Sequence, residues 1–163
     1  MNKKATKMIS LDTSTANTGY AYWKNGKLSG YGVIQSQGNH KNGDKTDDMM
    51  LRIDRYLKEK MPDIVVVEMT VVPLNAHTQR ELTELVGGIR NFCLMNKIEF
   101  FRLRPTQWRK LVRDKDEALP KKRNELKEWS KCKVKSLYNI DVTDDTSDSI
   151  LIGAAYIKTF EEE

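Results

Sequence analysis

Cysteine is scarce in this 163-residue sequence: Cys93 and Cys132 are the only two, and they lie far apart without a CxxC motif. Two separated thiols are too few for a zinc site, so we interpret them as reduced thiols. Long apolar runs are missing as well, since none approaches the ~18 residues of a membrane span. The basic segment Met1–Lys7 is not followed by a signal-like apolar core. We therefore expect a cytoplasmic protein without a membrane span.

Internal repeats and low-complexity segments are also absent from the sequence. The length is sufficient for one domain with a proper hydrophobic core. We expect a single domain over residues 1–163, in which residues 1–6 form a loose N-terminal tail.

Positive charge is concentrated in one part of the chain. The net charge is +5, yet the segment Arg102–Lys135 has 13 Lys or Arg against 5 Asp or Glu, which leaves −3 for all other residues. A basic segment on a mildly acidic body is the pattern expected of nucleic-acid binding. The alternative is a solvated helical face that has no such partner.

Hydrophobic periodicity predicts alternating strands and helices along the chain. The expected strands are residues 7–12, 18–24, 27–36, 64–68 and 98–103, and the expected helices are residues 46–60, 76–96, 105–112, 120–139 and 144–160. This order predicts an α/β fold with a mixed five-stranded sheet flanked by helices on both faces.

Local signals support several of these elements. Asn25-Gly26 predicts a two-residue hairpin turn, because both residues tolerate positive φ. Thr78 and Glu81 have the spacing of a capping box at the start of the second helix. Gly87-Gly88 lies inside that helix at a cost of ~1 kcal/mol each relative to Ala. We expect another backbone, from the sheet or from a partner subunit, to approach closely there.

Acidic residues stand at the ends of three apolar elements. Asp12 ends the first strand and Glu68 ends the fourth, so parallel pairing of these strands would bring them together at one sheet edge. Asp145 and Asp148 are three residues apart in the last helix and share a face. Asp144 precedes them, and we expect either Asp144 or Thr143 to cap that helix.

Four carboxylates cannot share a dry cleft as bare anions, so protons or cations must neutralise them. Oxygen-only ligation favours Mg²⁺ or Mn²⁺, and two such ions are a standard arrangement for phosphodiester hydrolysis. The alternatives are local: Asp12 could bond to a turn, and Asp145 and Asp148 could be partners of the helix dipole. The metal-site hypothesis fails only if all of these alternatives are true at once.

Several segments together resemble the RuvC family of Holliday junction resolvases, which belongs to the RNase H-like nuclease superfamily. The resemblance covers most of the chain. It rests on Ile9–Ile34, on Ile64–Glu68, on Asn75 and Gly87, on Arg104-Pro105-Thr106-Gln107 with Lys110 as a P-T-x-x-(Lys/Arg) segment, and on Asp145-Thr146-Ser147-Asp148-Ser149 as a closing D-x-x-D-(Ala/Ser).

This resemblance implies an RNase H-like fold and a homodimeric, Mg²⁺-dependent endonuclease that places paired symmetrical nicks in four-way DNA junctions. It implies two Mg²⁺ ions, for which Mn²⁺ can substitute. The metal ligands and catalytic acids would be Asp12, Glu68, Asp145 and Asp148. The active-site cation would be Lys122, with Lys121 and Arg123 as alternatives, and these three residues together with Lys110 would contact DNA. The helix 76–95 would form the dimer.

One position departs from the family pattern. Bacterial members commonly have an aromatic residue three positions after the second acid, where this chain has Val71. Val71 is therefore an expected DNA contact, since aliphatic residues also unstack base steps. The departure fits a phage or mobile-element version of the family.

Two alternative functions use the same residues. The first is another RNase H-like nuclease that cuts RNA–DNA hybrids or branched DNA in general. The second is a junction-binding protein without catalytic activity. The intact set of acids argues against the second alternative.

Overall fold

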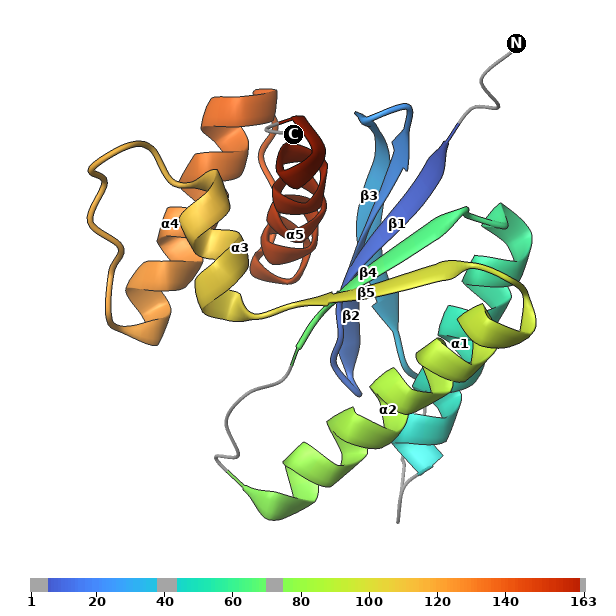
Figure 1. Ribbon diagram of the computed structural model, residues 1–163. Helices are drawn as coiled ribbons and strands as arrows, with labels where there is room; N and C mark the ends of the chain where they lie inside the picture. The colour runs from blue at the N-terminus through green and yellow to red at the C-terminus, as the bar shows by residue number, and fades with distance from the viewer. Residues whose placement is uncertain (1–5, 38–43, 70–74, 162–163) are drawn as a thin grey trace, which may run out of the picture.

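A buried strand lies at the centre of one five-stranded sheet in the computed structural model, which describes residues 6–37, 44–69 and 75–161. The sheet order is β3-β2-β1-β4-β5, with β1 parallel to β4 and antiparallel to β2 (Figure 1). β5 continues the parallel half of the sheet beside β4. The strands are β1 (Lys7–Asp12), β2 (Asn17–Lys24), β3 (Lys27–Gln35), β4 (Ile64–Glu68) and β5 (Glu99–Leu103).

The central strands consist of residues that suit burial on both faces. In β4, Val65, Val66 and Val67 are all fully buried, as is expected of a parallel strand covered on both sides. β2 and β3 form a hairpin whose turn residues, Asn25 and Gly26, have φ values of 50° and 75°. The predicted hairpin is thus confirmed.

Helices cover both faces of the sheet (Figure 1). One layer packs against Ile9, Leu11, Val65 and Val67, and the other packs against residues of the opposite face such as Ala21 and Trp23. The first layer is α1 (Asp44–Lys60) and α2 (Ala76–Met95), and the second is α3 (Pro105–Val112), α4 (Arg123–Tyr138) and α5 (Asp144–Glu161). The predicted mixed five-stranded α/β architecture is confirmed. No helix in the described ranges is long and apolar enough to cross a membrane.

The start of α2 differs from the predicted capping box. Asn75 is the N-cap, and its side-chain oxygen accepts hydrogen bonds from the backbone N–H groups of His77 and Thr78 at 2.8 and 3.4 Å. Because Asn75 already satisfies these donors, the helix begins three residues before the position that Thr78 and Glu81 indicated.

Within the described residues, no backbone of the sheet approaches the paired glycines of α2, while the approach of a partner subunit stays a prediction. A Cβ atom on Gly88 would meet the side chain of Met50 from α1, with Sδ at 2.6 Å. A Cβ on Gly87 would meet nothing within 4 Å. Gly88 therefore makes room for a side chain, and Gly87 lies on an open face of the helix.

A third glycine determines how α5 lies on the sheet. Gly19 of β2 pairs with Asp12, and a Cβ at Gly19 would lie only 1.6 Å from the backbone oxygen of Asp145. The first turn of α5 thus rests directly on the strand beside Asp12. Further along, the Ser10 hydroxyl donates to the backbone oxygen of Ser149 at 2.7 Å, which fixes the position of α5 along the sheet.

We predict that Gly19→Ala lowers the free energy of unfolding by about 1–3 kcal/mol, since the added methyl group must displace α5 or β2. Gly30→Ala is the matched control, because a Cβ there would first meet the Tyr22 Cβ at an ordinary 3.8 Å. Urea unfolding monitored by circular dichroism compares the two variants. Equal changes in both would contradict the assigned role of Gly19.

Candidate active site

The two predicted strand-end acids leave the sheet side by side. In the parallel register of β1 and β4, Leu11 is opposite Val67, so the next residues are Asp12 and Glu68. Carboxyl ends of parallel strands are the usual place for a site in an α/β sheet. The pairing expected from the sequence is therefore present.

The acids of α5 reach the same place because α5 lies against β2 at Gly19. Asp12, Glu68, Asp145 and Asp148 all line one cavity of about 520 Å³. Asp145 is exposed, whereas Asp12, Glu68 and Asp148 are partly buried. Three separate elements, β1, β4 and α5, thus bring all four predicted acids to one cavity.

Asp12 is the acid most affected by its surroundings. Burial raises the pKa of its carboxyl well above the usual value, and the neighbouring Asp148, Glu68 and Asp145 raise it further. Arg109 acts in the opposite direction. Like charges disfavour one another's ionised forms at short range, so the cluster is electrostatically unsatisfied without cations.

Glu68 and Asp148 each have a hydrogen-bond partner that favours the charged form. Burial raises the pKa of Glu68, while the Trp108 indole N–H donates to its Oε2 at 2.6 Å and opposes that shift. Burial also raises the pKa of Asp148, opposed by a hydrogen bond with Ser130. The second oxygen of Asp148, Oδ1, is buried and has no hydrogen-bond partner among the described residues.

The donor chemistry of the cavity fits an oxygen-preferring dication. All four acids supply carboxylate oxygens, and the buried Oδ1 of Asp148 still lacks a partner that a cation would provide. Within the described residues, however, no three Asp, Glu, His or Cys side chains already form a group that could hold a metal ion. A cation would have to draw these side chains together.

Arg109 of α3 is a candidate functional residue that the sequence analysis missed. It lines the cavity, and its guanidinium carbon lies 4.8 Å from the centroid of the Trp108 ring. Its Nε is buried and finds no hydrogen-bond partner in the part of the chain that the structure describes. Its charge lowers the pKa of Asp12, Glu68 and Asp148 alike. A count of four residues from Pro105 in the P-T-x-x-(Lys/Arg) segment falls on Arg109, so the signal was present in the sequence.

The predicted basic residues are placed differently from one another. Lys121 and Arg123 line the cavity, and so does Lys127, which the sequence analysis did not name. Lys122 is the exposed N-cap residue of α4, and Lys110 is exposed on α3. Val71 lies outside the described residues.

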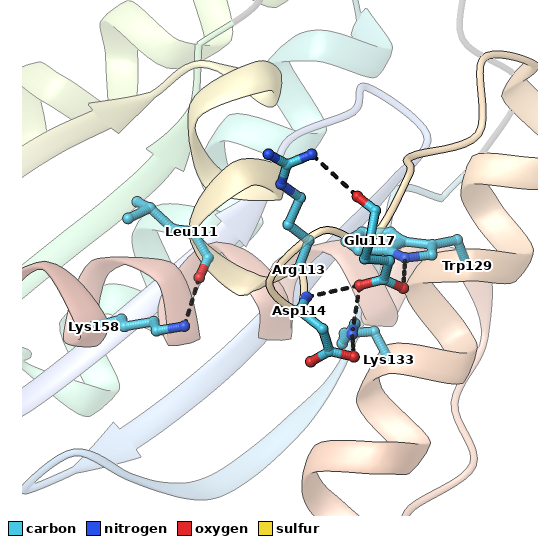
Figure 2. A network of polar contacts seen from close by, with 7 residues as sticks. All are labelled: Leu111, Arg113, Asp114, Glu117, Trp129, Lys133 and Lys158. Carbon is cyan, nitrogen blue, oxygen red and sulfur yellow. Dashed lines mark hydrogen bonds and ion pairs between the residues drawn. The ribbon is translucent and has the colours of Figure 1, made fainter.

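A group of polar contacts holds the loop before α4 against that helix (Figure 2). The Lys133 ammonium, whose side chain is only 6% exposed, lies 3.0 Å from Asp114 Oδ2 and 2.9 Å from Glu117 Oε2. The Trp129 indole donates to Glu117 Oε1 at 2.8 Å. Hydrogen bonding with Lys133 and with the backbone of Asp114 lowers the pKa of Glu117 to about 2. This loop clasp fixes the chain segment that leads to Lys121 and Arg123.

Comparisons with known proteins agree at the level of the fold. No protein-family model and no curated protein sequence matches the chain. Among solved structures, it is similar to RuvC of Thermus thermophilus in complex with a Holliday junction substrate, with a TM-score of 0.73, 10% identity and 96% of each chain covered.

Two other solved structures are similar across most of the chain. One is the fowlpox virus resolvase bound to Holliday junction DNA, with a TM-score of 0.62, 17% identity and 94% of this chain and 98% of that chain covered. The other is the yeast mitochondrial Holliday junction resolvase, with a TM-score of 0.61, 13% identity and 94% and 78% covered. The resemblance stated from the sequence is thereby confirmed in structure: this chain has the RNase H-like fold of the RuvC-type Holliday junction resolvases.

Proposed function

We propose that this protein is a DNA endonuclease that resolves four-way junctions by metal-dependent phosphodiester hydrolysis, with paired symmetrical nicks. One observation carries the proposal: three elements of a resolvase-like fold bring Asp12, Glu68, Asp145 and Asp148 to one cavity. Two of the similar structures contain junction DNA, which supports the choice of substrate.

The four acids are proposed to hold two Mg²⁺ ions, and Mn²⁺ is expected to substitute. Asp12 is the central ligand in this proposal, because it lines the same cavity as the other three carboxylates and all three raise its pKa. Bound metal would supply a water nucleophile at neutral pH and charge stabilisation at the attacked phosphate. Glu68 is kept in place for this role by the Trp108 indole.

Basic side chains around the acids are proposed to bind and orient the scissile phosphate. Arg109 is held over the Trp108 ring beside the acids, where a fixed cation stabilises the negative charge that develops on the phosphate. Lys121, just before α4, and Arg123, its first residue, also line the cavity and are proposed to stabilise the same negative charge. Lys122, the third candidate for the active-site cation, does not line the cavity among the described residues. Lys122 and Lys110 are proposed to contact the DNA backbone instead.

Cleavage of three labelled substrates in Mg²⁺ tests the proposal: a four-way junction with a mobile core, an RNA–DNA hybrid duplex and a flap. We expect preferential cutting of the junction and ligatable products. Asp12→Asn should abolish cutting, because a metal ligand is lost. Its junction affinity should persist, because the basic phosphate-binding residues remain.

Other outcomes of this assay overturn the proposal. A clear preference for the hybrid would assign the chain to another nuclease activity of the same fold. Junction binding without cutting in either Mg²⁺ or Mn²⁺ would make it a non-catalytic junction-binding protein. Each of these two results contradicts junction resolution directly.

We further propose that the active form is a homodimer joined through α2. The open face of this helix includes Gly87, and its C-terminal end exposes Leu94 and Met95, which are 66% and 76% exposed. Exposed apolar side chains on one helix favour association with a second copy. Two active sites in one assembly would account for paired nicks.

Gly87→Arg should convert the dimer to a monomer, because it would place a long charged side chain in the proposed dimer interface. Sedimentation velocity measures the change. The substitution should not unfold the protein, since Gly in a helix is about 1 kcal/mol less favourable than Ala and Arg is a good helix former. Leu51→Arg, at a 64% exposed position on α1, is the control and should remain dimeric. A Gly87→Arg variant that still sediments as a dimer rules out this face of α2.

A further inference from the structure

One acidic residue at the cavity belongs to none of the roles above. Asp144, in the first turn of α5, lies between two lysines of α4. Its Oδ2 is 3.6 Å from the Lys127 Nζ and its Oδ1 is 3.3 Å from the Lys131 Nζ. Each carboxylate oxygen thus faces a separate cation, which is the arrangement that the oxygens of a phosphate group make with basic side chains.

The two lysines continue a basic face that starts at the cavity. Arg123, Lys127 and Lys131 follow one another at intervals of four residues, so they share one face of α4 at a spacing of about 6 Å. Arg123 and Lys127 line the cavity. This spacing is comparable with the separation of neighbouring phosphates along a DNA strand. The face therefore leads outward from the acids along a path that a strand could follow.

The contacts of Asp144 are poorly explained by stability alone. Its side chain is 40% exposed, and those of Lys127 and Lys131 are 42% and 32% exposed. Ion pairs with this exposure contribute little to folding. The expected helix cap also fails to account for it, because Asp144 is itself a residue of α5 and the backbone oxygen of Thr143 accepts from Thr146 and Ser147.

We propose that Asp144 is an internal competitor for DNA, and that a backbone phosphate of the substrate displaces it. In the free protein Asp144 occupies Lys127, and it shares Lys131 with Glu128, whose Oε1 lies 2.7 Å from the Lys131 Nζ. This inference rests on the proposed function, because it adds two phosphate contacts to the same site. Asp144 then lowers the affinity for DNA in general, so that binding depends more strongly on contacts that a branched substrate alone supplies.

Asp144→Asn tests the proposal against a matched control, Asp141→Asn, three residues before the same helix. Asp141 pairs with Lys135 of α4 at 3.1 Å but is 88% exposed, and it is not among the described residues that line the cavity. Fluorescence anisotropy with a labelled four-way junction measures the Kd in saturating Ca²⁺, which should support binding with poor cutting. Asp144→Asn should tighten binding by about three- to tenfold, whereas Asp141→Asn should change it by less than about twofold.

A double-mutant cycle separates displacement from a general effect of charge. In a Lys127→Gln/Lys131→Gln background, Asp144→Asn should no longer tighten binding, because no lysine remains to be released. Lys127→Gln alone should reduce the slope of log affinity against log salt by about 0.9, as expected for one lost phosphate contact. Lys135→Gln should leave that slope unchanged.

The outcomes distinguish this inference from the function beneath it. If Asp144→Asn and Asp141→Asn act equally, or if the gain persists without the two lysines, the internal-competitor role is wrong while junction binding stands. If the unmodified protein does not prefer the junction to a duplex of equal length, the proposed function is wrong and the inference fails with it. Thermal unfolding of Asp144→Asn should match that of the unmodified protein.

Discussion

The structure depends on one electrostatic constraint, the burial of Asp12 among other carboxylates. Burial and three neighbouring acids all raise its pKa, and the positive charge of Arg109 opposes them. Leu11 is the last residue of β1 in either hydrophobic cluster, so core packing does not require an acid at position 12. Such an arrangement costs free energy in the folded protein and is typical of a functional site. We therefore interpret the acidic residues and the basic side chains around them as one functional unit.

Two sets of contacts position the elements that carry this unit. Gly19 lacks a side chain where α5 crosses β2, and this close approach places Asp145 beside the end of β1. Outside the cavity, the loop clasp of Asp114, Glu117, Trp129 and Lys133 ties the loop before α4 to that helix (Figure 2). The acidic side chains thus come from the sheet and α5, and most of the basic side chains come from α3 and α4. In the proposed function, phosphate binding and metal binding therefore belong to separate elements that meet at one cavity.

The predictability of these parts follows from the range of the interactions behind them. The four acids could be found because strand ends and a three-residue helical spacing are local features of the sequence. Asn75 as the cap of α2 and Arg123 as the start of α4 were missed for two reasons. A competing local signal was present at Thr78 and at Pro120, and the loop clasp joins residues 12 to 19 positions apart. Arg109 was missed although its motif position was readable, because Lys110 beside it is equally basic. Lys127 and Asp144 gain their significance from the packing of α4 on α5, which no local pattern encodes.

The most direct test of this account is urea unfolding of the unmodified protein and of Asp12→Asn, with and without Mg²⁺. A raised carboxyl pKa makes the charged form of Asp12 destabilising near neutral pH, and this penalty disappears as pH falls toward the ordinary carboxyl pKa of about 4. Without metal, Asp12→Asn should therefore be the more stable protein at neutral pH, by a margin that shrinks on acidification. Mg²⁺ should stabilise the unmodified protein and have much less effect on the variant. A metal-free variant that is less stable at every pH, or an equal response of both proteins to Mg²⁺, would contradict the assignment of Asp12 as the central metal ligand.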